Sequence, residues 1–259
     1  MCTLVIMRRP GHAWPLIIAA NRDEMVGRPW LPPARHWPDR AEVVAGLDET
    51  AGGTWLGVND FGVVAAVLDR RNSLGPRDGL RSRGELPLEA LDHEDAASAA
   101  QALAHISPSA YRSFNLVIAD AGRAYLLCLR FGGDARGKLP PVEVQEIPAG
   151  VSMVTASDLN DVSSPRIRAF LPRFQAAAPP DPASGDWAEW KALLASRVRD
   201  AESPPEAAMN IVTPTGFGTV CSSLIGLAAA DSEPSGLVWA FASGRPDANE
   251  SEMSEICTC

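Results

Sequence analysis

The sequence has very little lysine and no concentration of positive charge. Only Lys138 and Lys191 are lysines among its 23 basic residues, and 32 acidic residues bring the formal net charge to −9. A nucleic-acid-binding surface needs a basic stripe or run, and none stands out, so we expect no nucleic-acid partner. A GC-rich coding bias is the first explanation for the preference for arginine, and selection for guanidinium chemistry is the second.

Long apolar runs, cysteine and histidine are also scarce. No uninterrupted apolar run approaches the ~20 residues of a membrane-spanning helix, and residues 1–7 lack the basic segment that opens a secretory signal. The five cysteines form an odd set without the C-x-x-C or Cys/His spacing of a zinc site, and four histidines leave little room for a multi-histidine metal site. We therefore expect a cytoplasmic protein with no metal and no insertion into a membrane.

The remaining composition is that of a folded protein. The 259 residues are 46% apolar and 21% charged, which suffices for one large domain or two small ones. Short segments rich in Val, Ile and Leu predict strands at 2–7, 15–21, 42–48, 53–59, 62–69, 114–120, 124–130, 142–148, 151–157, 219–228 and 236–243. Two helical segments interrupt them. We expect an α+β fold with helices packed outside stacked sheets, in a single domain over residues 1–259.

The first helical segment, 88–105, suits an amphipathic helix that ends before Ser107 and Pro108. The second, about 165–199, is interrupted by a stretch rich in Pro, Ala and Gly. The spacing of Asp186 and Glu189 resembles a capping box and predicts that the helix restarts there. The side chains that would then share one helix face are Trp187, Trp190, Leu194 and Val198.

Cys2 is the first residue that could carry chemistry. Removal of Met1 would leave Cys2 with both a thiol and a free α-amine. That amine titrates near pH ~8 and can act as the general base for the thiol of its own residue. The alternative is that Cys2 is a small apolar residue at the start of a buried strand, which is the more common role for a lone cysteine.

Four consecutive polar residues, Asn21 to Glu24, follow the apolar strand segment Leu16–Ala20. This change predicts a strand end or a turn. The guanidinium of Arg22 could lower the pKa of a nearby thiol, and the carboxylate of Asp23 could hold the α-ammonium or its proton. The alternative is a hydrated turn with a local ion pair, which is common in charged turns.

These segments resemble a known family. Met1–Thr3, Ala19–Glu24, Gly52–Gly57, Arg83–Leu86 and Phe114–Leu116 occur in the order found in the NRDE family, also called the Transport and Golgi organisation protein 2 family. The resemblance extends to about residue 175. It implies a fold similar to the N-terminal-nucleophile (Ntn) hydrolases, a four-layer αββα sandwich in which a processed N-terminal cysteine attacks linear amides. It also implies, from the animal members, an association with heme trafficking and with lipid or acyl-coenzyme A metabolism.

A more distant resemblance is to bile-salt hydrolases and penicillin V acylases, which also begin Met-Cys-Thr. Those enzymes have an Arg and an Asp at the end of the second strand, where this chain has Asn21, Arg22 and Asp23. Their spacing is R-x-x-D, so whether Asp23 or Glu24 corresponds stays open. The resemblance thus implies a catalytic role for Cys2 together with this group.

The same resemblance implies an oxyanion hole made by two asparagines. By loop position these would fall near Asp69 and Asp158, both of which are aspartates here. A carboxylate would repel a developing oxyanion unless it were protonated, and the loss of one donor typically costs ~10²–10³ in rate. Backbone N–H groups or Asn160 could supply the missing donors.

Several further residues have both a structural and a functional interpretation. Trp55 follows a glycine pair and is either a substrate-facing side chain or a core residue. Asn115, inside a strand segment, is a buried hydrogen-bonding residue of structural or functional importance. Arg245, after the last strand segment, could contact an anionic substrate or be an exposed loop arginine. For Cys257 and Cys259, near the chain end, we expect no role.

The leading hypothesis is an Ntn-type hydrolase or acyltransferase that acts on a small linear amide or thioester. Cys2 would be the nucleophile and its own α-amine the base, and Arg22 and Asp23 would orient and tune that pair without a cofactor. The alternative is a non-enzymatic heme or acyl-carrier binding or trafficking protein. Since no C-x-x-C-H attachment site exists, His36 or a cysteine would then have to serve as axial ligand, if one is used. The sequence predicts neither the substrate nor the oligomeric state.

Overall fold

Two compact units make up the computed structural model, which describes residues 2–132, 139–229, 236–247 and 253–256. One unit combines the chain up to Arg28 with the chain from Pro148 onward, and the other is Pro29–Ile147. The prediction of a single domain over residues 1–259 stays a prediction.

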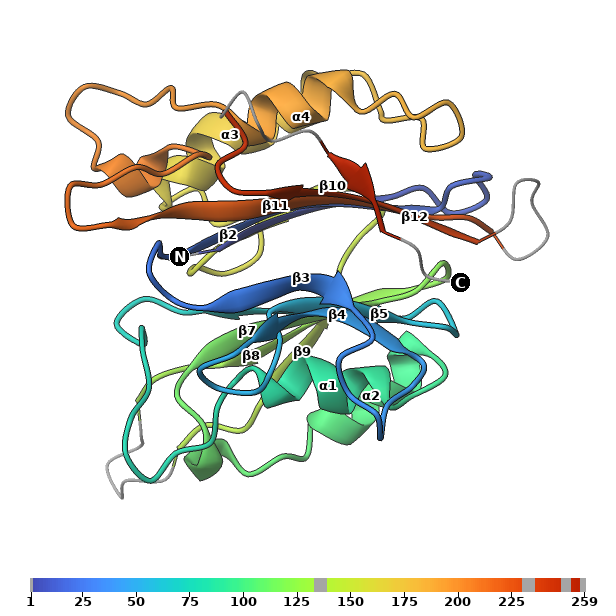
Figure 1. The fold of residues 1–259 in the computed structure, drawn as a ribbon, viewed down its shortest axis with the longest axis vertical. Coiled ribbons are helices and arrows are strands. Elements are labelled where there is room, and N and C mark those ends of the chain that lie inside the picture. The colour runs from blue at the N-terminus through green and yellow to red at the C-terminus, as the bar shows by residue number, and fades with distance from the viewer. Residues whose placement is uncertain (1, 133–138, 230–235, 248–252, 257–259) are drawn as a thin grey trace. The chain divides into compact units, whose positions relative to one another are not determined.

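The first unit contains a six-stranded antiparallel sheet with the order β10-β1-β2-β11-β12-β13 (Figure 1). Its strands are β1 (Thr3–Arg8), β2 (Leu16–Met25), β10 (Gly150–Val154), β11 (Phe217–Leu227), β12 (Leu237–Ser243) and β13 (Ser254–Glu255). Two α-helices, α3 (Pro165–Ala176) and α4 (Ala188–Leu194), and a short 3₁₀ turn, η2 (Pro205–Ala207), accompany it.

One face of this sheet packs against the helices. Val5 and Ile17 project from it into an apolar core that contains Phe170, Phe174 and Trp190 of α3 and α4. The alternate residues of the same strands are buried as well. Strands buried on both faces have continuous apolar runs, which is why these strands were predictable from sequence.

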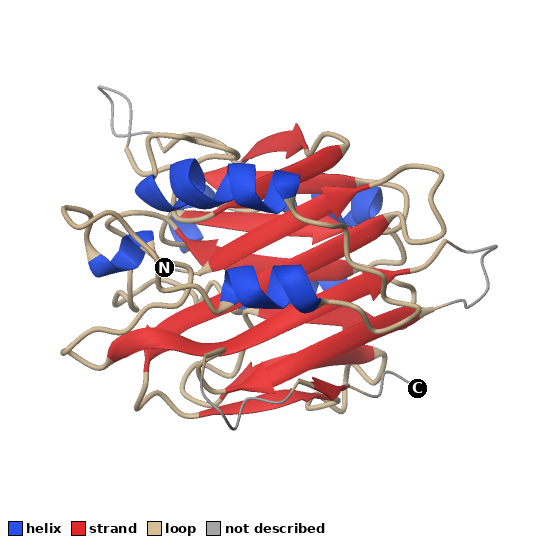
Figure 2. Cartoon of the chain, turned by 90° about the horizontal axis from the view of Figure 1, so that it is seen from above, coloured by secondary structure: helices blue, strands red, loops and turns tan. Residues whose placement is uncertain are grey.

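The second unit is a seven-stranded antiparallel sheet with the order β3-β4-β5-β6-β7-β8-β9. Its strands are β3 (Trp30–Ala34), β4 (Val43–Asp48), β5 (Leu56–Asn59), β6 (Val64–Asp69), β7 (Phe114–Ala119), β8 (Ala124–Leu129) and β9 (Glu143–Glu146). The helices are α1 (Glu85–Leu91), α2 (Ala96–Leu103) and the 3₁₀ turn η1 (Pro108–Ala110). Most of the regular structure is strand, with few and short helices (Figure 2).

The polar segment Asn21–Glu24 differs from its prediction. It is not a strand end or turn but the second half of β2, where it pairs with β11 throughout and, through Asn21, with β1. The long partner β11 supplies hydrogen bonds to the backbone here, and side-chain partners within the unit replace water for Asn21 and Asp23. The polarity of these residues therefore marks a buried polar cluster rather than a turn.

The helical segments also differ in detail. The single helix expected over 88–105 is two helices, because Asp95 is extended and caps α2 by accepting a hydrogen bond from the Ser98 N–H. The predicted capping box at α4 does not form: Glu189 accepts instead from the Ala178 N–H, 2.8 Å away. Val198, expected on the apolar face of that helix, lies beyond α4 and is exposed.

Candidate active site

Cys2 lies directly before β1, a strand flanked on both sides by β10 and β2. Its side chain is partly exposed, and its Sγ lies 3.9 Å from the backbone carbonyl oxygen of Asp23. Because its thiol is partly exposed, Cys2 is accessible to a small molecule, whereas the buried thiols of Cys128 and Cys221 are not.

The Asp23 carboxylate is fully buried beside that position. Arg166 of α3 forms an ion pair with it, with Nη1 3.0 Å from Oδ2, and Thr219 of β11 donates to Oδ1 at 2.7 Å. The same Arg166 nitrogen also donates to the hydroxyl of Thr3, the residue after Cys2. This cluster ties the ends of three strands and a helix together next to Cys2.

Asn21 is held on the same side of the sheet. Its Nδ2 donates to the carbonyl oxygens of Leu194 and Met209, each at 3.0 Å, and Ser222 donates to its Oδ1 at 2.6 Å. Both polar ends of the amide thus have partners within the protein. In this arrangement Asn21 joins β2 to the end of α4.

Arg22 lies on the opposite face. Side chains alternate along a strand, so Arg22 projects away from the side to which Asn21 and Asp23 point. Cys2 precedes Thr3, whose hydroxyl reaches Arg166 on the helix side, so the same alternation puts the Cys2 thiol on the face of Arg22. Of the four polar residues predicted as a group, Arg22 and Glu24 therefore share the face of the thiol, and Asp23 approaches the thiol with its backbone carbonyl and not with its carboxylate.

Arg22 is also the cross-strand neighbour of Cys221. Burial raises the pKa of the Cys221 thiol, while the positive charge of Arg22 opposes that rise and the Cys2 side chain adds to it. Cys221 therefore stays protonated at neutral pH. Arg22, Cys2 and Cys221 thus interact electrostatically. Of the two thiols, Cys2 is partly exposed and Cys221 is buried.

Asp158 is placed at the same end of the sheet as Cys2. Strand β10 pairs with β1 so that Val154 lies opposite Leu4. Two further residues in this register bring the chain level with Cys2, and Asp158 follows two residues later in the bend, half-buried. The sequence-based position of Asp158 near the nucleophile is thus compatible with the strand register.

Asn160 shapes that bend. It has a positive φ of 56°, accepts a hydrogen bond from the Met153 N–H at 2.7 Å, and donates from Nδ2 to the Ser152 hydroxyl at 3.2 Å. These contacts hold the amide against β10. Its side chain therefore closes the bend after the strand.

Three of the remaining candidates, Asp69, Asn115 and Trp55, belong to the second unit. Asp69, at the end of β6, forms an ion pair with Arg83, with Nη2 and Oδ1 2.8 Å apart. Arg83 also donates to the carbonyl oxygens of Ser73 and Ser113. The arginine of the R-G-E-L motif thus fixes the loop that follows β6.

Asn115 is completely buried on β7. Its Oδ1 accepts from Arg70 Nη1 at 2.6 Å and from the Cys128 thiol at 3.2 Å. Cys128 is buried and lies in this polar cluster, with its Sγ also 3.8 Å from Arg70.

Trp55 packs within the second unit. Its ring lies over Gly46, where an added Cβ would be 2.2 Å from a ring carbon, and it meets Trp30 edge-to-face at 5.7 Å. Gly53 approaches Gly84 so closely that an added Cβ would be 2.5 Å from the Gly84 carbonyl carbon. The two glycine-containing motifs therefore pack against each other.

Arg245 follows β12 and is 48% exposed, with its Nε 3.5 Å from Asp247. Cys257 and Cys259 lie outside the described residues. His36, the axial ligand considered for heme, donates from Nε2 to the Pro32 carbonyl oxygen at 2.8 Å.

No cluster of three or more His, Cys, Asp or Glu side chains that could hold a metal ion occurs among the described residues. Within those same ranges no helix has the length and apolar character needed to cross a membrane.

Sequence reasoning missed Arg166 and Thr219. Arg166 had a recognisable signal: it lies four residues before Phe170 and eight before Phe174, so it occupies the apolar stripe of its helix. A charged residue in such a stripe is expected to have a buried partner of opposite charge. Thr219, in an apolar strand, had no comparable signal.

The sequence model described as "Transport and Golgi organisation 2" matches residues 1–226. The Transport and Golgi organization protein 2 homolog of Bos taurus is 35% identical over 148 residues, which are 54% of this chain and 51% of that protein. The homolog of Homo sapiens is 33% identical over 146 residues, with the same two shares. The chain thus spans about half the length of the curated relatives it matches, and their names state no activity.

Solved structures are similar over nearly the whole chain. The Caenorhabditis elegans N-acylethanolamine-hydrolyzing acid amidase ortholog matches with a TM-score of 0.55 and 12% identity, over 90% of this chain and 96% of that chain. A variant of conjugated bile acid hydrolase from Clostridium perfringens matches with a TM-score of 0.50 and 11% identity, over 99% and 98%. At these identities the likeness shows the fold alone, and it confirms the expected Ntn-hydrolase-like α+β class.

Proposed function

Because this chain belongs to the Transport and Golgi organisation 2 family and has an Ntn-hydrolase-like fold, we propose that it is an Ntn-type hydrolase or acyltransferase with Cys2 as nucleophile. Its substrate would be a small linear amide or thioester. The observation that carries the proposal is the partly exposed Cys2 thiol at the head of a central strand, on the face of Arg22. Fold alone does not imply function, so the proposal rests on this site.

The reaction would proceed once Met1 has been removed. The α-amine of Cys2 takes the thiol proton, and Sγ attacks the carbonyl carbon of the substrate. The amine then returns a proton to the departing nitrogen or sulfur, and an acyl thioester remains on Cys2. Attack by water releases a carboxylic acid and makes the protein a hydrolase, whereas attack by an amine or thiol makes it an acyltransferase.

Arg22 and Asp23 would have different roles in this reaction. The buried charge of Arg22 favours the thiolate over the thiol. Asp23 faces the Cys2 sulfur with its backbone carbonyl, while its carboxylate binds Arg166 and Thr219. We therefore propose that Asp23 positions the nucleophile through the strand backbone instead of holding the α-ammonium with its carboxylate.

The oxyanion would be bound near the bend that follows β10. Backbone N–H groups of that bend are candidate donors, and the Asp158 side chain, which lies in the same bend, is the candidate that the distant resemblance suggested. We assign no catalytic step to Asp69, Trp55, Asn115 or Arg245, whose side chains have the structural contacts described above.

Turnover of defined substrates tests the proposal. The probes are N-acyl aminomethylcoumarins and acyl N-acetylcysteamine thioesters of short and long chain, combined with intact mass spectrometry of the purified protein. We expect a protein that begins at Cys2, that hydrolyses members of one series, and that loses this activity in Cys2→Ala. Cys128→Ser is the matched control, because Cys128 is a thiol of the other unit, and it should retain activity.

Two results would overturn the proposal. One is unchanged turnover in Cys2→Ala, and the other is an active protein that retains Met1, since the α-amine could then not act as base. The non-enzymatic alternative has its own measurement, the Soret band on titration with hemin. Tight binding that is lost in His36→Ala would favour it over the enzyme.

A further inference from the structure

Arg166 connects two strand ends beside the candidate active site from the helix-covered face of the sheet. Its Nη1 donates to the Thr3 hydroxyl and, at 3.0 Å, to Oδ2 of Asp23. Its Nε donates to the carbonyl oxygen of Glu206 at 2.9 Å, which fixes the guanidinium plane. Thr3, Asp23 and Arg166 are all buried, so water does not compete for these hydrogen bonds. We call these three residues the strand clamp.

The strand clamp lies where the pairing of β1 with β2 stops. Among the described residues, the last pair of that ladder is Thr3 with Asn21, and Cys2 lies beyond it. The last pair of a ladder opens more easily than an internal pair, because it has a neighbouring pair on one side only. Since Arg166 binds Thr3 of β1 and Asp23 of β2, it ties the two strands together next to Cys2, beyond the end of their ladder.

The removal of Met1 that the proposed function requires makes this anchor important. Cys2 is then covalently attached to the protein only through Thr3, and chain ends fray unless they are tied down. When the backbone of Thr3 is fixed, the planar peptide bond between the two residues is fixed as well. The thiol and the α-amine then move only by rotation about ψ and χ1 of Cys2. The anchor of Thr3 is therefore also the anchor of the nucleophile.

The strand clamp leaves the face of the thiol open. Side chains alternate along a strand, so Thr3 and Asp23 point to the helix-covered face, whereas Cys2 and Arg22 point to the other face. The register that pairs Thr3 with Asn21 puts Cys2 opposite Arg22. The clamp thus holds the neighbours of both groups without covering either one. Because the attraction between a guanidinium and a thiolate falls with distance, holding Cys2 opposite Arg22 favours the thiolate.

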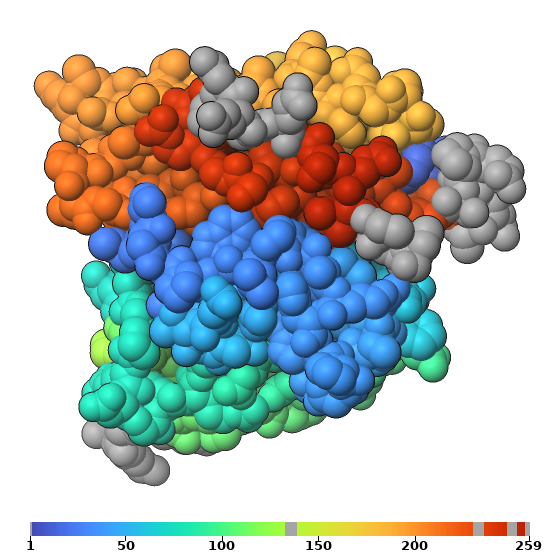
Figure 3. Space-filling model, in the orientation of Figure 1, coloured from blue at the N-terminus to red at the C-terminus, as the bar shows by residue number. Residues whose placement is uncertain are grey.

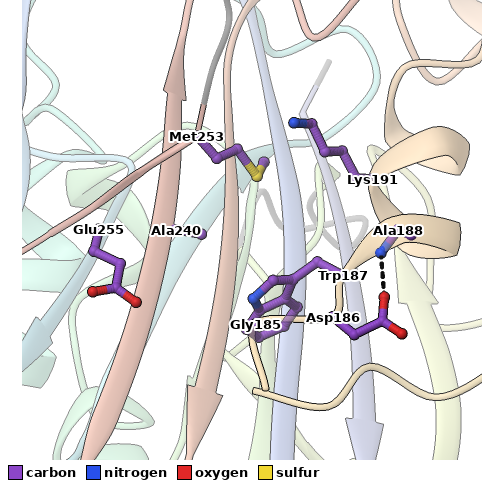
Figure 4. Close-up of a pocket in the computed structure, with 8 residues that line it drawn as sticks. All are labelled: Gly185, Asp186, Trp187, Ala188, Lys191, Ala240, Met253 and Glu255. Carbon is purple, nitrogen blue, oxygen red and sulfur yellow. Dashed lines mark hydrogen bonds between the residues drawn. The ribbon is translucent and has the colours of Figure 1, made fainter. Parts of the chain in front are cut away.

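A cavity on the helix-covered face is separate from the strand clamp. It has a volume of about 490 Å³ and lies between α4 and the last strands, with Trp187, Lys191 and Ala240 in its wall (Figure 4). No residue of the strand clamp belongs to its lining. In the space-filling view the helical segment, in yellow-orange, lies against the C-terminal strands, in red (Figure 3). A molecule in this cavity would therefore not touch the clamp.

We propose that Arg166 and Thr3 are positioning residues for Cys2. This inference rests on the proposed function, because it takes Cys2 as the nucleophile. Arg166 acts through the Thr3 hydroxyl and the Asp23 carboxylate, and it touches neither the thiol nor the substrate face. A reacting group displaced by ~1 Å can lose about 10² in rate. Loss of the anchor should therefore lower kcat much more than it changes KM.

The first test is the pH profile of Cys2 alkylation by iodoacetamide, read by peptide mapping on the full-length protein. Thr3→Val keeps the shape of the side chain and removes the hydroxyl that binds Arg166. Released from Arg22, the Cys2 thiol should titrate closer to an ordinary cysteine. We expect the midpoint of the profile to rise by about 0.5–1 pH unit and the rate at pH 7 to fall about three- to tenfold. Thr3→Ser retains a hydroxyl and should restore the parent profile.

A matched control makes the same chemical change elsewhere. Thr54 of the second unit is buried, and its hydroxyl donates to the Leu56 carbonyl oxygen at 3.1 Å. Thr54→Val should leave the alkylation profile of Cys2 unchanged. Circular dichroism and thermal unfolding of every variant separate a loss of folding from a shift of the profile.

Arg166→Lys is the second variant, for use if Thr3→Val does not fold. It keeps a cation beside the buried Asp23 carboxylate but loses the planar fork that serves Thr3 and Asp23 together. The same upward shift of the Cys2 profile is expected. An unmoved profile in folded Thr3→Val or in folded Arg166→Lys would overturn the proposal. So would a profile in Thr3→Ser that moves as far as in Thr3→Val, since the hydroxyl would then not be the anchor.

Turnover separates this inference from the proposed function. With a substrate that the parent hydrolyses, Thr3→Val should lower kcat about tenfold and change KM less than twofold, and Thr3→Ser should restore kcat. A parent that turns over no substrate, but whose Cys2 profile shifts as expected, would count against the enzyme and in favour of the clamp. An active parent whose Cys2 profile and kcat do not change in Thr3→Val would overturn the clamp and leave Cys2 as the nucleophile.

Discussion

Arg166 and Asp23 form an ion pair in which the side chains are only 3% and 0% exposed. The contact joins α3 to β2, and the additional bonds from Arg166 to Thr3 and from Thr219 to Asp23 extend it to β1 and β11. Thr3, whose hydroxyl binds the same Arg166, is the residue that directly follows Cys2. The strand ends next to the proposed nucleophile are thus held together by a buried ion pair, in a segment that the sequence predicted to be a strand end or a turn.

The ion pair gives the first prediction. Arg166→Met leaves the Asp23 carboxylate buried without its cation, so we expect a loss of ~3–5 kcal/mol in the free energy of unfolding. Asp23→Leu alone should cost a similar amount. The double variant, which removes both charges, should recover most of the loss.

Urea unfolding of the parent, the two single variants and the double variant measures the coupling between them. Single variants that each cost less than ~1 kcal/mol would show that the pair is not desolvated as described. Strictly additive effects would show that the two side chains do not depend on each other.

The second prediction concerns thiol reactivity. Cys2 should react with iodoacetamide faster than Cys128 or Cys221, because it is the partly exposed one of the three and lies on the face of Arg22. Arg22→Met should slow the labelling of Cys2 severalfold at pH 7, since the guanidinium favours the thiolate.

Peptide mapping after timed labelling provides the rates, and Arg123→Met, which removes an exposed arginine of the second unit, is the matched control. A shift of the pH profile of labelling in Arg22→Met separates an electrostatic role from a structural one. Equal rates for Cys2 and Cys221, or no effect of Arg22→Met, would contradict the assignment.

Much of the fold was predictable because its strands are apolar on both faces. β3 was missed, since Pro32 and Pro33 remove backbone donors and prolines in a sequence indicate loops. The structure accommodates them at the edge of the sheet, where the pairing register with β4 shifts between Leu31 and Ala34. Edge position is a tertiary property that local sequence does not contain.

The sequence indicated which residues to group in the candidate site but not to which face of the strand each side chain points. Asn21, Arg22 and Asp23 were grouped because they are adjacent in sequence, and adjacency in a strand puts alternate side chains on opposite faces. Had the segment been assigned to β2, that alternation would have separated Arg22 from the other two. The partner Arg166 comes from far along the chain, so only the packing of α3 brings it to Asp23.

Asp158 provides the third prediction. If its side chain lies at the oxyanion position, Asp158→Asn replaces a repelling carboxylate with a hydrogen-bond donor, and we expect kcat with the preferred substrate to rise by ~10–100-fold at pH 7. Asp200→Asn, which changes an exposed carboxylate of the same unit, should leave kcat unchanged. A fall in kcat for Asp158→Asn would mean that the carboxylate itself takes part in the reaction.

The last prediction concerns Tyr111, whose pKa is raised to about 12 by burial first and by the negative charge of Glu89 second. In the unfolded chain the phenol loses its proton near pH ~10, so between pH ~10 and ~12 the folded protein binds more protons than the unfolded one. Stability therefore falls as pH rises through that window, by at most ~1.4 kcal/mol per pH unit from this group, and is unaffected by it below. The Tyr111 hydroxyl makes no hydrogen bond to the described residues, so Tyr111→Phe should cost little at pH 7. Urea unfolding at pH 8, 10 and 11 should then show a smaller alkaline loss for Tyr111→Phe than for Tyr125→Phe, which alters the other tyrosine of the chain; equal losses would mean that the Tyr111 phenol ionises as readily in the folded protein as in water.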